Sequence, residues 1–216
     1  MPLRGLRRRG RCCEARRILL RLSLRRSSSS SSSAAPPNQS SNSAALTAEE
    51  EAAAAEIKSS LLRARKGSVE DLVRTLAAEC SEVRLTSGVA DSLLRRCGDD
   101  WKSALGFFLW AQSRGGGYSH TPYACNRMVD LLGKMRQIDR MWDLLSEMHC
   151  RGLVTVDTIA KSIRRLAAAR RWRDAILLFD QLEDLGLERN TETMNVLLDA
   201  LCKEKKVELA RECAQD

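Results

Sequence analysis

Apolar and polar positions alternate with a helical period along the last hundred residues of the chain. Between Asn126 and Leu153 apolar residues recur three or four positions apart, and the same arrangement returns from Ala160 to Leu187 and again from Asn195 onward. Spacings of i, i+3 and i+4 predict amphipathic α-helices that bury one face. Each segment therefore predicts two short helices, joined by a basic or polar turn and closed by a glycine.

These segments repeat with a period of 34 to 35 residues. Asn126 and Asn195 lie 69 positions apart, which is twice 34.5, and Gly152 and Gly186, each followed by Leu, lie 34 apart. Apolar columns coincide across the segments: Val129, Ile163 and Leu198; Leu132, Leu166 and Leu201; Met141, Ala175 and Ala210. A period of this length with two helices per unit predicts an all-α solenoid.

Charge is distributed unevenly along the 216 residues. The chain holds 36 Lys and Arg against 28 Asp and Glu, a formal charge of +8. Residues 1–33 contribute +9, residues 34–121 contribute −1, and residues 122–216 carry sixteen charges of each sign. The net charge of the repeat region therefore gives no support for nucleic-acid binding.

The basic N-terminus has the composition of a targeting sequence. Residues 1–33 hold ten Arg, eight Ser and one acid, and Arg17, Arg21 and Arg25 share a helix face beside a Leu-rich stretch. This predicts an organellar transit peptide, engaged by the import machinery. The arginines favour import into the mitochondrion, and the serine run is also compatible with import into the plastid. A basic RNA-binding tail is the alternative.

The remaining organisation follows from composition. Pro-Pro and small polar residues mark a linker, Thr47 is a predicted N-cap, Gly67 a predicted stop, and the stretch WKSALGFFLWAQ suggests a degenerate unit. The predicted order is a transit peptide at 1–33, a disordered linker at 34–46, a helical lead-in at 47–84, a degenerate repeat at 85–121, repeats at 122–155 and 156–190, and an incomplete repeat at 191–216.

Catalytic and metal chemistry finds no sequence support. The eight cysteines include no Cys-x-x-Cys pair, and the two histidines, His120 and His149, have no carboxylate or Cys at metal-binding spacing except Cys150, which is adjacent to His149. No glycine-rich phosphate loop or zinc-deaminase signature occurs. We expect no metal, no cofactor and no enzymatic activity. No apolar run approaches the ~18 residues that span a bilayer, so no membrane insertion is expected.

Two motifs resemble a known family. PYACNRMV and TETMNVLL match the usual beginning of the pentatricopeptide repeat, and IDRMWDLLSEM and WRDAILLFDQL match its second helix. LDALCKEKKVELA is a further close match to the repeat. The repeats therefore resemble those of plant organellar pentatricopeptide proteins of the P class. The tetratricopeptide repeat has the same period, but its Trp-Leu-Gly-Tyr pattern is absent.

This resemblance implies that each repeat presents its first helix to one base of single-stranded RNA. In the family the fifth residue and the last residue of a repeat set the base. The matching positions are Asn126 with Thr155, Ala160 with Asn190, and Asn195 without a partner. Asn accompanies pyrimidines in the family, so two repeats favour U or C. Helix N-capping is the alternative role for these asparagines.

Other positions carry weaker expectations. The family places an apolar residue second in the repeat, where this chain has Tyr123, which can stack on a base, and Asp157 and Glu192, which cannot. Candidate phosphate contacts near the ends of the first helices are Lys134, Arg170, Arg171 and Lys203. Solvated helix ends, favoured by the helix dipole, are the alternative role for these bases.

The expected function is binding of organellar RNA, acting by occupancy in processing, splicing, stability, editing or translation, with processing or ribosomal proteins as further partners. The alternative is a protein-interaction adaptor in the mitochondrion, for example one associated with the ribosome, without sequence-specific reading. Three repeats that each read one base distinguish only 4 × 4 × 4 = 64 trinucleotide sequences, too few to specify a transcript. Because the last repeat stops inside its second helix without a capping unit, we expect a truncated chain or the front of a longer protein.

Overall fold

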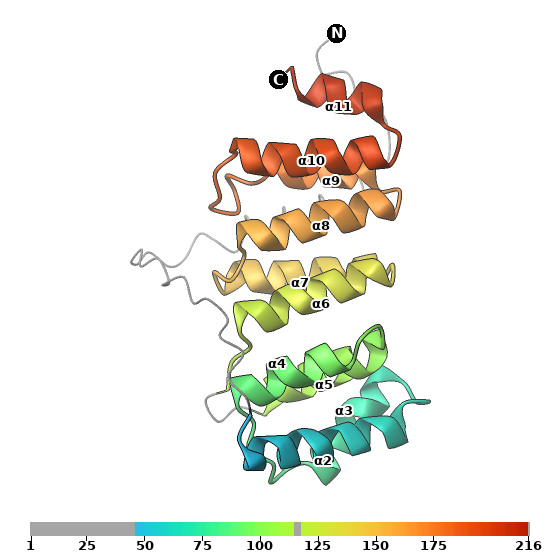
Figure 1. The fold of residues 1–216 in the computed structure, drawn as a ribbon, viewed down its shortest axis with the longest axis vertical. Coiled ribbons are helices and arrows are strands. Elements are labelled where there is room, and N and C mark those ends of the chain that lie inside the picture. Colours follow the sequence, from blue (N-terminus) through green and yellow to red (C-terminus); the bar gives the residue numbers. More distant parts are fainter. Residues whose placement is uncertain (1–45, 115–117, 216) are drawn as a thin grey trace. The chain divides into compact units, whose positions relative to one another are not determined.

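The computed structural model describes residues 46–114 and 118–215 (Figure 1). The predicted transit peptide and nearly all of the linker lie outside these residues. The described part contains ten helices and no strand, which confirms the all-α prediction. The helices are α2 (Ala48–Ala64), α3 (Val69–Glu79), α4 (Ser87–Arg96), α5 (Trp101–Ser113), α6 (Pro122–Lys134), α7 (Ile138–Cys150), α8 (Val156–Ala168), α9 (Trp172–Asp180), α10 (Thr191–Lys203) and α11 (Val207–Cys213).

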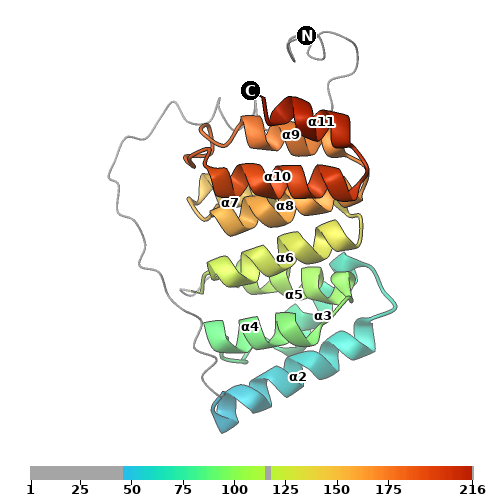
Figure 2. The ribbon, with the colours of Figure 1, turned by 45° about the horizontal axis from the view of Figure 1, so that its top comes forward.

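The described residues divide into two compact units, and the boundary along the sequence falls within α6. The N-terminal unit comprises residues 46–131 and the C-terminal unit residues 132–215. Helices of both units follow one another in antiparallel pairs, each joined by a short turn (Figures 1 and 2). The pairs α6–α7, α8–α9 and α10–α11 fall within the segments assigned above to the three repeats.

The N-terminal unit stacks two helix pairs. Helix α2 packs against α3 and α4, and α3 packs against α5, so first helices meet first helices and second helices meet second helices. Leu72, Leu93, Phe107 and Trp110 fill the core between these layers. Gly106 permits the close approach of α5 to α3, because a Cβ there would lie 2.7 Å from the Leu72 Cβ. The predicted lead-in thus contains a complete helix pair, α2–α3.

The C-terminal unit follows the same plan. Helix α8 packs against α9 and α10, and α10 packs against α11. Met141, Trp142, Ile163 and Leu166 are buried, in agreement with the periodicity that predicted the helices. Gly133, in the last turn of α6, lies close to α8, where a Cβ would lie 2.4 Å from the Arg165 Cβ. This glycine is required by the contact between successive first helices.

Two kinds of turn connect the helices of the C-terminal unit. The turns after α7 and α9 contain Gly152 and Gly186, with φ of +66° and +78°, as the repeat pattern predicted. The backbone amides of Leu153 and Leu187 donate to the carbonyls of Met148 and Leu182 at 2.9 and 3.0 Å. This hydrogen-bonding pattern closes a helix around a left-handed residue, which glycine adopts without steric penalty.

The turns after α6, α8 and α10 have the same backbone conformation without glycine. Arg136, Arg170 and Lys205 have φ of +57°, +62° and +58°. In each turn the next residue donates its amide back to the preceding helix, with N–O distances of 2.8 Å from Gln137 to Leu132, 2.8 Å from Arg171 to Leu166 and 2.9 Å from Lys206 to Leu201. A left-handed conformation costs an ordinary L-residue roughly 1–2 kcal/mol.

Candidate nucleic-acid interface

The first helices of the C-terminal unit carry two of the predicted base-reading residues. Asn195 is exposed on α10, whereas Ala160 on the neighbouring helix α8 is 9% exposed. Each lies three residues after an exposed acid of its own helix, Glu192 and Asp157 respectively, and a spacing of three places both on one helix face. An amide on this surface can donate to and accept from a base edge, and a methyl group cannot.

The corresponding residues on α6 belong to the N-terminal unit. Asn126 is only 8% exposed, although its type and position matched the expectation for a base-reading residue. Tyr123, three residues earlier, is 39% exposed and presents an aromatic ring at the start of the helix. Burial therefore limits Asn126 more than sequence alone indicated, while Tyr123 is available for stacking.

The last residues of two predicted repeats are helix caps. Thr155 precedes α8, and its hydroxyl accepts the Thr158 amide at 3.3 Å. Asn190 precedes α10, and its Oδ1 accepts the Thr193 amide at 2.9 Å. Capping thus accounts for Thr155 and Asn190. It does not account for Asn126 or Asn195, which lie inside their helices.

The four predicted phosphate contacts differ in their surroundings. Arg171 pairs with the buried Asp174 through its Nε and lies 3.8 Å from Asp139. The Lys203 Nζ lies 2.7 Å from the Asp199 carboxylate. Lys134 is exposed at the end of α6, and Arg170 is exposed in the turn after α8. Arg171 and Lys203 are therefore already engaged by acids of this chain.

Two further basic residues escaped the sequence analysis. Arg136 and Lys205 occupy the positions of Arg170 in the turns after α6 and α10, 34 residues before it and 35 residues after it. Their spacing equals the repeat period, and this signal was present in the sequence. Of the two acidic second positions, Asp157 forms an ion pair with Lys161, one helical turn away.

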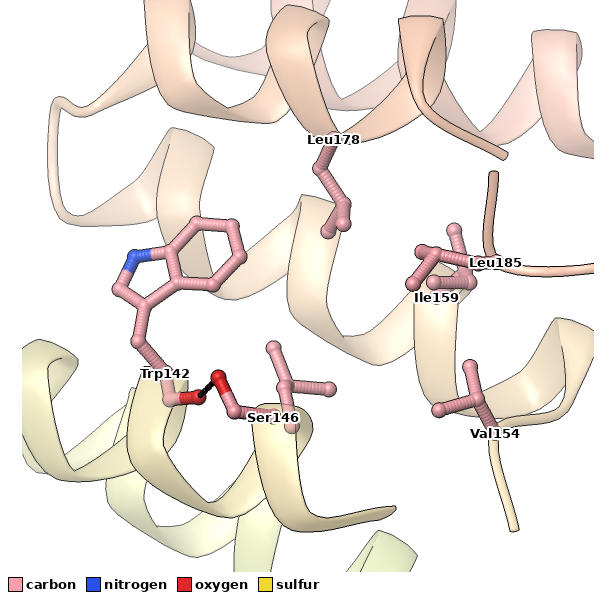
Figure 3. A pocket seen from close by; sticks show the side chains of 7 residues that line it. Trp142, Ser146, Val154, Ile159, Leu178 and Leu185 are labelled. Atoms are coloured by element: carbon pink, nitrogen blue, oxygen red, sulfur yellow. Dashed lines mark hydrogen bonds between the residues drawn. The ribbon is translucent and has the colours of Figure 1, made fainter. Parts of the chain in front are cut away.

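The C-terminal unit contains a small cavity between α7, α8 and α9 (Figure 3). Its volume is about 10 Å³, room for roughly one water molecule. The indole of Trp142 points toward Leu178, and Ile159 and Leu185 form the facing wall. The Ser146 hydroxyl donates to the Trp142 carbonyl at 2.9 Å and is thereby satisfied. This cavity belongs to the packed core and is too small for a nucleotide.

Two acidic groups of the N-terminal unit, Cys97 and Asp91, have raised pKa values. Burial raises the pKa of the Cys97 thiol to about 11, which keeps this sulfur protonated and unreactive. Burial also raises the pKa of Asp91, partly offset by the Thr121 hydroxyl that donates to it at 2.9 Å. The described residues hold no cluster of His, Cys, Asp or Glu able to ligate a metal. Across the same residues, no helix has the length and apolarity needed to span a bilayer.

Comparison with known proteins identifies the repeat. A family model described as PPR repeat matches residues 123–153 and 192–213, which carry the pairs α6–α7 and α10–α11. The chain is 45% identical over 148 residues to pentatricopeptide repeat-containing protein At3g04130, mitochondrial, of Arabidopsis thaliana. The chain belongs to the pentatricopeptide repeat family. Proteins of this family generally bind organellar RNA and are typically non-catalytic.

Further pentatricopeptide relatives share this similarity. Protein At3g22670, mitochondrial, of Arabidopsis thaliana is 41% identical over 155 residues, and protein At3g49730 is 35% identical over 143 residues. The alignments cover 68%, 70% and 65% of this chain, but only 29%, 27% and 22% of the three relatives. The chain thus corresponds to less than a third of the length of each pentatricopeptide relative.

Proposed function

We propose that this chain binds single-stranded RNA in the mitochondrion and acts by occupying the RNA rather than by bond chemistry. The observation that carries the proposal is the exposed amide of Asn195 on a first helix of a pentatricopeptide repeat, the position from which the family reads a base. Bound RNA would be protected, or made available to splicing, editing, processing or translation factors.

Base reading is proposed to be concentrated in the C-terminal unit. Asn195 offers a donor and an acceptor to solvent, and we assign it a pyrimidine preference. Ala160 offers neither, so the α8–α9 repeat contributes shape and backbone contacts. Asn126 contributes through the small part of its side chain that is exposed, next to Tyr123 as a stacking residue.

Asn195→Ala tests this assignment without disturbing the fold, because the side chain is exposed and Ala favours a helix. Binding of the full chain to oligouridylate and to oligoadenylate is compared by fluorescence anisotropy. We expect the variant to lose its preference for oligouridylate. Cys202→Ala, at an exposed position of the same helix, is the matched control and keeps the preference. An unchanged preference in Asn195→Ala would remove base reading from this residue.

Asn190→Ser and Asn190→Ala separate capping from base contact at the last position of the α8–α9 repeat. Ser retains the N-cap of α10, so stability is preserved, whereas Ala lowers it by about 1 kcal/mol. If Asn190 reads a base, both variants change the sequence preference. If only the Ala variant alters binding, the residue acts as a cap and its base-reading role is withdrawn.

The mitochondrial assignment is supported by the names of two relatives and by the arginine-rich composition of residues 1–33. Fusion of residues 1–40 to a fluorescent reporter tests it. We expect the reporter to enter mitochondria; plastid import would move the proposal to the other organelle, and a cytosolic signal would reject the targeting role.

A protein-binding adaptor remains the competing function. The exposed acids Asp157 and Glu192 occupy positions where the family usually places an apolar residue. A chain that fails to bind any single-stranded RNA at low salt, yet retains a partner from mitochondrial extracts after nuclease treatment, would establish the adaptor in place of the RNA binder.

A further inference from the structure

The turns after α6, α8 and α10 contain the three residues other than glycine that have a positive φ in the described part of the chain, and all three are basic. Arg136, Arg170 and Lys205 occupy equivalent positions, each followed by an amide hydrogen bond back to the preceding helix. Chance does not readily place a cation at every one of three strained and equivalent sites.

Glycine is the residue that such a position favours, and this chain uses it elsewhere. Gly98 follows the C-cap of α4 in the N-terminal unit with φ of +57°, Gly152 follows the C-cap of α7, and Gly186 closes the turn after α9. A Cβ at any of these three glycines would meet no atom within 4 Å. Lack of space for a side chain therefore does not explain why these three positions are glycine. The left-handed backbone conformation alone favours glycine there. The basic residues are retained against that preference.

The three side chains are also uncommitted. Arg136, Arg170 and Lys205 are exposed, and none of them makes an ion pair or side-chain hydrogen bond with another described residue. Neighbouring bases differ in this respect, because Arg171 pairs with Asp174 and Lys203 with Asp199. The three cations remain available to a ligand from solution.

The three turns lie at one end of the helices of the C-terminal unit, on the right in Figures 1 and 2. Helix α8 packs against α10, and α6 approaches α8 at Gly133 and Arg165, so successive turns are neighbours. Packed helix axes lie about 8–10 Å apart. The basic side chains thus form a row with one cation per repeat.

Charge separates the two ends of these helices. Residues 134–140, 168–174 and 203–209 hold nine basic and four acidic residues, a balance of +5. The segments at the other end, residues 150–157 and 180–192, comprise loops and the adjoining helix ends and hold two basic and six acidic residues, a balance of −4. The equal numbers of positive and negative charges in residues 122–216 therefore hide an uneven distribution between the two ends of the helices. The acids at the basic end are Asp139, Asp174, Glu204 and Glu208.

The second helices add a smaller contribution. No side chain caps the N-termini of α7 and α9, whose N-cap residues are Gln137 and Arg171. Amide groups at these ends point toward the basic turns, and a helix N-terminus favours an anion. Asp139 and Asp174 in the first turns offset part of this effect.

We infer that Arg136, Arg170 and Lys205 form a phosphate-contacting row along which the RNA backbone lies, and that the chain accepts left-handed strain at three turns to keep a cation in each. This inference rests on the RNA binding proposed above and adds two contacts, Arg136 and Lys205, to it. The strained residues supply charge that is independent of sequence, and the first helices supply base choice.

The test is a triple variant, Arg136→Gly, Arg170→Gly and Lys205→Gly, in the full chain. Affinity for oligouridylate is measured by anisotropy over a range of salt concentrations, and stability by thermal unfolding. Each lost phosphate contact flattens the salt dependence by about 0.7, so the slope falls by roughly 2 and the affinity at 0.1 M salt by roughly 100-fold. The same variant unfolds several degrees higher, because glycine relieves the strain.

Two control variants make this result specific. Arg136→Lys, Arg170→Lys and Lys205→Arg keep the charge and bind within a few-fold of wild type. Arg151→Gln, Arg189→Gln and Arg211→Gln remove the same total charge without touching the row, and leave the salt slope near that of wild type. Equal slopes for this control and the glycine variant would reduce the row to general electrostatics and overturn the inference.

The remaining outcomes separate the two proposals. A wild-type chain that binds no RNA at low salt overturns the proposed function and the inference with it. Wild-type binding with an unchanged slope in the glycine variant overturns the inference alone. A glycine variant that unfolds at a lower temperature than wild type contradicts the strain argument and overturns it as well.

Discussion

The turn between α4 and α5 and the turn between α6 and α7 each contain a residue with a positive φ. In the first, Gly98 adopts the left-handed conformation and Asp100 caps the next helix, accepting the Ser103 amide at 3.3 Å. In the second, Arg136 adopts that conformation and Gln137 precedes α7 without a capping hydrogen bond. The turns after α8 and α10 follow the second scheme.

The α4–α5 turn thus has residues that favour local stability, whereas the α6–α7 turn has a positive charge in their place. The α4–α5 turn uses the residues that turn and cap preferences favour. The three turns of the C-terminal unit omit both glycine and cap, and gain a row of cations. Packing of the helices alone does not favour the absence of glycine and cap at three turns. The cations would favour contact with phosphate, as proposed above.

The largest effect is expected where the first helices touch. Gly133→Ala places a Cβ 2.4 Å from the Arg165 Cβ, an atom fixed by its own backbone, so α6 must move away from α8. We expect a loss of about 1–3 kcal/mol in the free energy of unfolding, measured by urea denaturation. Gly88→Ala is the control, since its nearest contact is the flexible end of Leu46. Equal stability of both variants would contradict the described contact.

The next largest effect on the free energy of unfolding is expected when the residue before the second helix of a pair is replaced, and it should differ between the two turns. Asp100→Ala should lower the free energy of unfolding by about 1–2 kcal/mol, because the amide end of α5 loses its acceptor. Gln137→Ala should change it by less than about 0.5 kcal/mol, because no side-chain cap is lost at α7. Asp100→Asn retains an acceptor and serves as control. A large loss in Gln137→Ala would show that the second kind of turn is capped after all.

A basic residue placed at the left-handed position of the α4–α5 turn is expected to lower the free energy of unfolding by a somewhat smaller amount. Gly98→Arg puts an arginine at φ of +57° with free space around its Cβ, so only backbone strain opposes it. We expect a loss of about 1 kcal/mol in chemical denaturation. Gly98→Asn, a residue that tolerates this conformation, should lose less. An arginine variant as stable as wild type would show that these turns carry no strain.

The smallest effect concerns a pH-dependent cap in the N-terminal unit. The Thr86 hydroxyl, donating at 2.7 Å, and the Thr47 amide lower the pKa of Glu50. A carboxylate with a lowered pKa stabilises the fold above its unfolded pKa, and this contribution is lost as pH falls through the folded value. Glu50→Gln should therefore be slightly less stable at neutral pH and should converge with wild type in acid. A difference independent of pH would assign the effect to packing.

Sequence alone anticipated much of this architecture. Periodic apolar residues located the helices, Thr47 was identified as a cap and Gly152 as a helix stop, and the structure confirms each. Gly186 has the expected positive φ, but α9 ends six residues earlier, at Asp180. Gly133 was missed because a close approach depends on the facing helix, which no local pattern reveals. The second helix of the lead-in, α3, was missed because it belongs to no recognised repeat.

The candidate interface was less predictable. The burial of Asn126 and the engagement of Arg171 depend on neighbouring residues and side-chain packing, so residue type and spacing could not give them. Arg136 and Lys205 repeat with Arg170 at the repeat period, but the left-handed backbone conformation that the three residues share became visible only in the structure. The base-reading roles of Asn195, Asn190 and Thr155 stay predictions.

Binding of the wild-type chain to single-stranded oligouridylate across a salt series tests the central claim most directly. We expect measurable binding at low salt, weaker binding to oligoadenylate, and a linear fall of log affinity with log salt whose slope corresponds to about three phosphate contacts or more, at roughly 0.7 per contact. Absence of binding at low salt, or binding that does not change with salt, would contradict it.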